Sequence, residues 1–355
     1  MNRNHIYPII QALIAAFLFG VSAPLAKLLL GNFEPIPLAA FLYLGCGFGL
    51  LGIKIYQRIN RKSLDREAQI KKPDFIWLGG AILAGGVAAP ITLLYSLQNT
   101  PAATASLLLN FEGVATTLIA ALAFKESISQ RAWWAIVLIT LSSIFLSINL
   151  NASWGFSLGA LGIIIACILW GVDNNFTRNI SAKDPLMIVT IKGLGAGIFS
   201  LAMAMIFGNK FPGLGIILEA MLLGSLSYGV SIVLFIRAMR GLGAARTSAL
   251  FGTAPLAGMM LSFFLFRELP GWMFIIALPL MILGALFLVN EQHKHYHVHE
   301  IIIHEHAHTH EDGHHLHSHE GVNNPNHSHL HEHKPLDHEH DHMPDLHHRH
   351  IHPPE

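Results

Sequence analysis

A few ionisable side chains lie inside long apolar runs of this chain, and they are the first candidates for chemistry. Glu112 lies near the middle of one run, close to Asn110, and Lys192 lies within another. A charged group in an apolar environment is costly and therefore suggests a functional site. Glu112 can bind a proton or a cationic group, and Lys192 can be its counter-ion or hold an anion. Alternatively, Glu112 is a structural acid paired with a base on another helix, and Lys192 extends to the edge of the apolar layer.

Three further polar side chains are candidates for the same site. Asp173 follows Trp170-Gly171 near the end of one apolar run, and Tyr95 and Tyr228 lie within two others. Each of them can line a cavity, but Asp173 can equally pair with Arg178 at the interface, and tyrosines also serve packing between helices. The candidate substrate-binding or coupling residues are therefore Glu112, Lys192, Asn110, Asp173, Tyr95 and Tyr228.

A second group of candidate ligands lies at the C-terminal end, where 23 of the 24 histidines fall between His293 and His352. Imidazole suits Ni, Zn, Co and Cu, and nearby carboxylates add charge. The composition is too polar for a core, so we expect a disordered tail over 292–355 with many exchangeable metal sites. Alternatively, the tail is only a solvated segment whose charge changes at about pH 6.5. The candidate metal ligands are His304, His306, His308, His310, His315, His317, His319, His327, His329, His331, His333, His338, His340, His342, His348, His350 and His352.

Composition and missing motifs argue against several classes of function. The chain is 52% hydrophobic and only 12% charged, whereas soluble domains carry about a quarter charged residues. The sequence is mostly apolar and shows no strongly basic surface, so we expect no nucleic-acid partner. No P-loop or GxSxG motif occurs, so we expect neither an enzyme nor an ATP-driven pump. Cys46 and Cys167 are isolated and form no disulfide or metal pair. We expect no required cofactor, with divalent metal (Ni, Zn, Co or Cu) as an optional ligand of the tail.

The elements that hold these residues are apolar runs that approach the length of about 20 residues needed to cross a bilayer. The sequence predicts an all-α integral membrane protein with ten transmembrane helices. The runs are 6–30, 36–53, 75–97, 102–124, 132–148, 156–172, 186–207, 213–236, 247–266 and 270–289.

The distribution of basic residues predicts how the helices are oriented. With the N-terminus in the cytoplasm, 18 Lys and Arg residues fall on the inner side, and three (Lys27, Lys210 and Arg267) fall on the outer side. The positive-inside rule therefore predicts a multi-pass protein of the cell membrane, inner or plasma, with both termini in the cytoplasm. Its expected surroundings are the lipid bilayer, and a homodimer is an open alternative.

An internal repeat divides the ten runs into two halves. Residues 103–126 align without gaps over 245–268, with six of 24 positions identical, and both stretches end in a basic–Glu pair. Residues 34–47 align over 184–197, and both begin with an acid–Pro pair. Five spans followed by five spans invert the second half, which is a transporter architecture. We expect repeats over 1–149 and 150–291, followed by the tail.

The repeat, the FGVSAPLAK segment (19–27) and the LLLNFEGVATTLIAALAFKE segment (107–126) resemble the EamA group of the drug/metabolite transporter superfamily. The resemblance implies that the first four helices of each half line a central cavity and that the fifth and tenth pack outside. It also implies export or exchange of small metabolites, driven by a gradient. In that pattern a basic residue often follows the acid–Pro pair; here Lys192 occupies this place in the second half and Leu42 in the first.

Two functions remain open from the sequence. The helices move a small organic metabolite and the tail binds metal, or they move a divalent metal ion (Ni, Co or Zn) or its chelate, supplied by the tail. The helical part has no intramembrane His and no cluster of acids, which favours the organic solute. A metal-responsive receptor is a third alternative, but the chain has no output domain.

Overall fold

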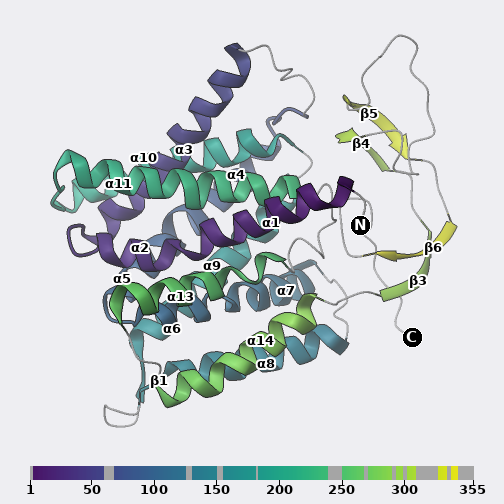
Figure 1. The fold of residues 1–355 in the computed structure, drawn as a ribbon. Helices are drawn as coiled ribbons and strands as arrows, with labels where there is room; N and C mark the ends of the chain where they lie inside the picture. The colour runs from purple at the N-terminus through teal and green to yellow at the C-terminus, as the bar shows by residue number, and fades with distance from the viewer. Residues whose placement is uncertain are drawn as a thin grey trace.

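The computed structural model describes residues 3–59, 68–124, 130–149, 155–180, 183–238, 250–267, 271–289, 293–298, 302–308, 327–333 and 337–342. Apolar runs have become helices, which lie side by side in one bundle (Figure 1). The helices are α1 (Arg3–Gly20), α2 (Ser22–Leu29), α3 (Pro35–Ile59), α4 (Asp74–Ala81), η1 (Ile82–Ala88), α5 (Ala89–Gln98), α6 (Ala102–Leu108), α7 (Phe111–Phe124), α8 (Gln130–Ser147), α9 (Leu158–Arg178), α10 (Pro185–Ile206), α11 (Leu214–Gly224), η2 (Ser225–Val230), α13 (Ala254–Phe266) and α14 (Trp272–Val289).

Seven helical segments among the described residues are long and apolar enough to cross a membrane. They are Tyr7–Leu29, Pro35–Ile59, Asp74–Gln98, Ala102–Ala123, Leu158–Arg178, Pro185–Ile206 and Leu214–Ala238. Three shorter apolar helices, Trp133–Leu146, Ala254–Phe266 and Trp272–Gly284, fall in the other three predicted runs. The chain is therefore a helical multi-pass membrane protein.

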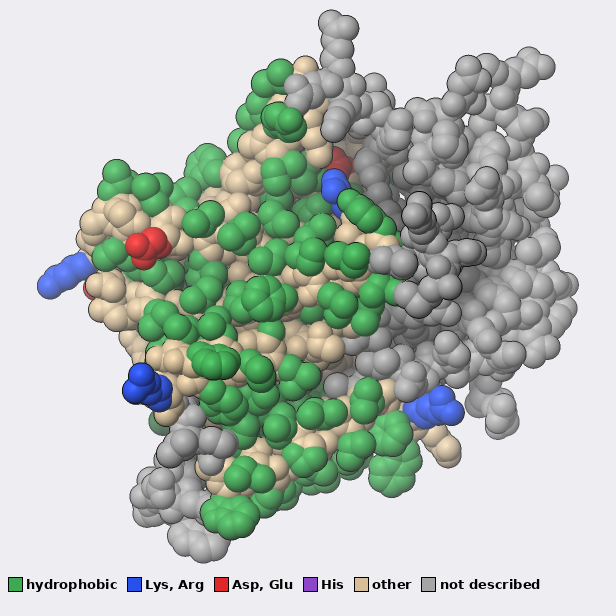
Figure 2. All heavy atoms as spheres, in the orientation of Figure 1, with side chains coloured by type: hydrophobic (Ala, Val, Ile, Leu, Met, Phe, Trp, Pro, Cys, Tyr) green, Lys and Arg blue, Asp and Glu red, His purple; other side chains and the backbone are tan. Residues whose placement is uncertain are grey.

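The outer surface of the bundle is suited to lipid. Large hydrophobic side chains cover much of the face seen in Figure 2, and few charged side chains interrupt them. Phe17, Ile198 and Phe264 are 59%, 60% and 78% exposed. In a bilayer this surface meets hydrocarbon, while the helices satisfy their own backbone hydrogen bonds.

Helices α3 and α10 pack closely and run in opposite directions. A side-chain carbon added at Gly47 would lie 2.7 Å from Leu194, and one added at Gly197 would lie 2.6 Å from the Leu44 nitrogen. As the numbering rises along one helix it falls along the other, so the pair is antiparallel. The glycines remove the side chains that would otherwise keep the two backbones apart.

Helices α8 and α14 pack against each other at one edge of the bundle (Figure 1). The Ser142 hydroxyl donates to the Ala277 carbonyl at 2.8 Å. A side-chain carbon added at Gly284 would lie 2.6 Å from the Ile139 side chain. This peripheral position is the one that the sequence resemblance implies for the fifth and tenth helices. The N-terminus of α1 and the end of α14 lie at the same end of the bundle.

Six short strands complete the described structure. Strand β1 (Ile148–Asn149) pairs with β2 (Gly155–Phe156) between α8 and α9. In the tail, β3 (His293–Val298) pairs antiparallel with β6 (Asp337–His342), and β4 (Ile302–His308) with β5 (His327–His333). These four segments differ from the expected disorder, because histidines that alternate with other residues have the period of two that suits a strand. Composition alone does not detect that period.

Candidate functional site

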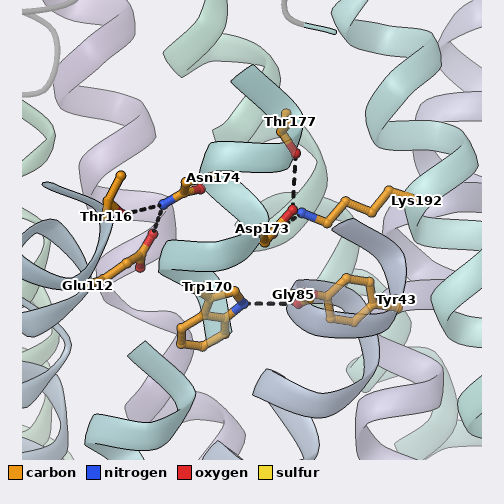
Figure 3. A network of polar contacts seen from close by, with 9 residues as sticks. All are labelled: Tyr43, Gly85, Glu112, Thr116, Trp170, Asp173, Asn174, Thr177 and Lys192. Carbon is orange, nitrogen blue, oxygen red and sulfur yellow. Dashed lines mark hydrogen bonds and ion pairs between the residues drawn. The ribbon is translucent and has the colours of Figure 1, made fainter. Parts of the chain in front are cut away.

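A cluster of polar side chains lies inside the bundle, and its centre is an ion pair between two helices (Figure 3). Asp173 in α9 pairs with Lys192 in α10, and it accepts a hydrogen bond from the Thr177 hydroxyl at 3.0 Å. The side chains of Asp173 and Lys192 are only 3% and 14% exposed. A buried charge must be paired, and this geometry pairs both. Lys192 thus pairs with Asp173 rather than with Glu112.

Glu112 lies beside this pair but has neutral partners. The Asn174 amide donates to Glu112 Oε1 at 2.8 Å and to the Thr116 hydroxyl at 3.1 Å. Asp173 and Asn174 are neighbours in α9, and Figure 3 shows them pointing to opposite sides. One turn of α9 therefore carries both parts of the cluster, the closed ion pair with Lys192 and the amide bound to Glu112.

Glu112 occupies the first turn of α7, directly after a break in the helix. Helix α6 ends at Leu108, and the Asn110 N–H donates to the Leu107 carbonyl at 3.1 Å in the connecting turn. Asn110 thus shapes the break rather than the cluster. Half-helix N-termini near the middle of a membrane are favourable places for negative charge, because the helix dipole points its positive end there.

The two parts of the cluster differ in how far their side chains are exposed. The ion pair is buried, but Asn174 is exposed and Glu112 is half-buried. Next to Glu112, a side-chain carbon added at Gly113 would meet nothing within 4 Å. The partial exposure of Glu112 and the exposure of Asn174 make this part of the cluster the accessible one.

A backbone carbonyl completes the interior network. In η1 the Ala89 N–H bonds to the Ala84 carbonyl, five residues back. The Gly85 carbonyl then lacks its usual partner, and the residue five positions on is Pro90, which has no N–H. Two side chains replace the helical bond, because Tyr43 donates to this carbonyl at 2.7 Å and Trp170 Nε1 at 3.0 Å. Such π-helical segments often occur at functional sites.

Aromatic rings from both halves of the chain contact one another next to this network. The Tyr43 and Tyr228 ring centroids are 5.6 Å apart, and Phe19 meets Tyr228 edge-on at 6.1 Å. Tyr228 belongs to η2, a second π-helical segment in the second half. The candidate Tyr95 in α5 is 47% exposed and does not take part in these contacts. The structure thus groups four of the predicted residues, Glu112, Asp173, Lys192 and Tyr228, and leaves Asn110 and Tyr95 outside.

Sequence reasoning missed several members of the cluster. Asn174 was not a candidate residue, and the roles of Trp170, Tyr43 and Gly85 were not predicted. For Gly85 a signal was present, since a Gly pair followed by Pro90 inside an apolar run marks a disturbed helix. For the aromatic residues no signal separates a network member from ordinary packing.

The predicted metal ligands stand apart from this cluster. Those at 304, 306, 308, 327, 329, 331, 333, 338, 340 and 342 lie in the tail strands, for which only the backbone path is described. Those at 310, 315, 317, 319, 348, 350 and 352 lie outside the described residues. Among the side chains that are described, no group of three or more His, Cys, Asp or Glu could hold a metal ion.

Gly85→Ala tests the close contact on which the ion pair depends. An added carbon at Gly85 would overlap the Asp173 carboxylate, whereas one at Gly79, in the same span, would meet nothing within 4 Å. We expect Gly85→Ala to destabilise the protein by about 1–3 kcal/mol, the usual cost of overpacking. Thermal unfolding in detergent measures the difference, with Gly79→Ala as the matched control. Equal melting temperatures for the two variants would contradict the contact.

The comparison with known protein families identifies one family. The model of the EamA-like transporter family matches residues 6–148 and again residues 157–290. An "Uncharacterized transporter" of Methanothermobacter thermautotrophicus is 30% identical over 272 residues, which cover 73% of this chain and 79% of the relative. A solved structure known only as "Crystal structure of protein" matches with a TM-score of 0.58 and 19% identity, over 78% of this chain and 94% of its own. That last likeness concerns the fold alone.

The family model matches nearly all of the helical region in two copies, and the seven helices of membrane-spanning length suit a transporter. The chain belongs to the EamA-like transporter family.

Proposed function

We propose that the chain is a secondary transporter that moves a small organic solute through the polar cluster of Glu112, Asn174, Asp173 and Lys192. One observation carries the proposal. Helices α7, α9 and α10, from both halves of the chain, place three ionisable groups in contact or near contact inside a membrane bundle. Intramembrane charges of this kind mark substrate and ion pathways, and carriers bind their cargo where two repeats meet.

We propose ten membrane spans in two inverted repeats, 1–149 and 150–291. The double match of the family model supports the division. The three shorter apolar helices supply the remaining spans, and the antiparallel packing of α3 on α10 suits an inverted relation. With ten spans the two ends lie on one side, as in Figure 1. The excess of basic residues at that end favours the cytoplasm for both termini.

The two acid–Pro pairs form clamps at opposite ends of α3 and α10. Glu34, just before α3, accepts a hydrogen bond from the Lys210 N–H at 3.1 Å and another from the Asn209 amide, just beyond α10. Gly208, with φ of 69°, makes the turn that presents both donors. These donors, the Lys210 backbone first, lower the pKa of Glu34 below its ordinary value. We call this contact the outer clamp.

The second clamp repeats this arrangement with the roles of the helices exchanged. Asp184, just before α10, caps that helix through the Leu186 N–H at 2.9 Å and pairs with Lys54 near the end of α3 at 3.2 Å. We call this contact the inner clamp. Each acid thus holds the far end of the other repeat's helix. Inverted repeats with matching clamps at both ends suit a carrier that opens to one side at a time.

For the tail we propose reversible binding of divalent metal by its histidines. Truncation after Asn290 is expected to remove the binding of Ni or Zn and to leave a folded bundle, because the histidines of the tail supply the ligands. Calorimetric titration of the full-length and truncated proteins measures it. Metal binding that survives truncation at unchanged stoichiometry would place the site among the helices.

Transport of divalent metal or its chelate is the second candidate function, and the concentration of 23 histidines in the C-terminal part of the sequence favours it. A panel of amino acids, nucleobases, organic amines and divalent metals in proteoliposomes, with and without the tail, separates the two. Saturable flux of an organic solute that persists without the tail supports the first. Metal flux that fails without the tail supports the second, and no flux of any solute overturns both.

A further inference from the structure

The charges in the polar cluster do not balance. Glu112 and Asp173 are two acids, and Lys192 is the one base that faces them among the described residues. Lys192 is bound to Asp173, so that pair is internally neutral. Glu112 receives only an amide hydrogen bond from Asn174. An ionised Glu112 therefore leaves the cluster with one uncompensated negative charge, which is costly in a membrane unless a cation or a proton joins it.

The surroundings of Glu112 supply no other counter-charge. Asp173 and Cys167 face it from α9, Lys192 from α10 and Tyr228 from η2. Apart from Lys192, which is engaged, these groups are acids or neutral. The compensating charge therefore has to come from outside the described part of the protein.

The fold does not need an acid at this position. By the internal repeat, Glu112 in the first half corresponds to Ala254 in the second. The junction of α7 and α9 packs Ala115 against Gly171, where an added carbon would lie 3.0 Å away, and the junction of α1 and α13 packs Ala257 against Gly20 at 3.1 Å. The two halves thus form the same alanine–glycine contact, with Glu112 nearby in one half and Ala254 in its place in the other. This argues against a purely structural role for Glu112.

We propose that Glu112 and Asn174 bind the ammonium group of a small organic amine, and that Glu112 carries a proton when no amine is bound. The inference rests on the proposed transport function and names its substrate class. An ammonium group has three donors. Glu112 Oε2 and the carbonyl oxygen of the Asn174 amide are acceptors that no described donor occupies. Asn174 is exposed and Glu112 is half-buried, so the amine can reach these acceptors from the exposed side of Asn174.

Two aromatic side chains near the carboxylate, Trp170 and Tyr228, are buried inside the bundle. Trp170 lies one helical turn before Asn174 in α9, and Tyr228 faces Glu112 from η2. Both suit an apolar or aromatic body attached to a cationic head. Binding the amine displaces the proton of Glu112 to solvent, so charge is conserved as one proton leaves for each monovalent amine that enters.

The test uses solutes of matched shape and different charge. Benzylamine, benzyl alcohol and benzoate form one set, and propylamine, propanol and propionate form another. Each solute, adjusted to the pH of the sample, is added to full-length protein in weakly buffered detergent, and an indicator dye reports released protons. We expect saturable release of up to about one proton per chain with an amine and none with its alcohol or acid. Affinity for the amine should fall about tenfold for each pH unit below the point where Glu112 becomes protonated.

Glu112→Gln is the decisive variant, because it keeps the shape and removes the exchangeable proton. It should abolish proton release while its melting temperature stays near that of the wild type. The histidine tail buffers protons equally in both proteins, so the difference in release between wild type and variant reports on Glu112 alone. Asn174→Ala should keep the release and weaken amine affinity about tenfold, the worth of a hydrogen bond to a charged group. Full release in Glu112→Gln, equal release by alcohol and amine, or no release by any amine would overturn the inference. Flux of alcohols or acids in proteoliposomes without proton release would overturn it and leave the transport function standing.

Discussion

Lys192→Met is expected to destabilise the bundle by about 3–5 kcal/mol, because it leaves a buried carboxylate without its partner. Asp173 is 2% exposed and is enclosed by Thr177, with Gly85 packed directly against its carboxylate. Water cannot replace the lost ammonium group without separating these helices. Urea or thermal unfolding in detergent, followed by circular dichroism, measures the loss.

Two further variants make this prediction specific. Lys192→Met combined with Asp173→Asn removes both charges and should recover most of the stability, since the two positions are coupled. Lys54→Met is the matched control, because it breaks an ion pair whose side chains are 25% and 19% exposed and should cost about 1 kcal/mol or less. If Lys192→Met were no less stable than Lys54→Met, the Asp173 ion pair would not be the internal anchor described above. If the double variant were no more stable than Lys192→Met, the cost would arise from packing instead of charge.

The seven spans that the structure supports could be predicted from the sequence because their signal is long and redundant. Each run is mostly apolar over about 20 residues, and one misplaced residue changes little. The repeat was visible for the same reason, since the acid–Pro pairs at Glu34 and Asp184 recur with matching surroundings. The clamps that these acids form could not be predicted, because their partners Lys210 and Lys54 lie far away in the sequence.

The choice of partners inside the cluster was also beyond the sequence. Several acids lie within or next to the predicted spans, and Glu112 and Asp173 are the two that the sequence offered as partners for this cluster. Which one Lys192 reaches depends on the rotation of α9 about its own axis. These helices are apolar on nearly all sides, so no hydrophobic face fixes that rotation in advance. The same ambiguity misplaced Tyr95, which points away from the network although it lies in the same span as Gly85.

Asp184→Ala and Glu34→Ala are expected to shift the carrier in opposite directions. Asp184→Ala releases the inner clamp and should favour opening at the end that holds the termini. Glu34→Ala releases the outer clamp and should favour opening at the other end. The partly exposed pair of Lys54 and Asp184 contributes about 1 kcal/mol or less, so its loss should change the ratio of the two states by up to about fivefold. Glu34→Ala should change the same ratio in the opposite direction.

Access to the cluster provides the measurement. Asn174→Cys, in a background where the buried thiols Cys46 and Cys167 are replaced by Ser, places one reactive thiol at the exposed side of the cluster. Its labelling by an impermeant maleimide, applied from either side of oriented vesicles, reports which end is open. Acidification on the outer side should mimic Glu34→Ala. The pKa of Glu34 is lowered in the folded protein, so its clamp is present at neutral pH and is lost as the pH falls through that pKa. If both variants shifted labelling toward the same side, the two contacts would be ordinary surface interactions. A shift in opposite directions is the result that only clamps at opposite ends of one pathway produce.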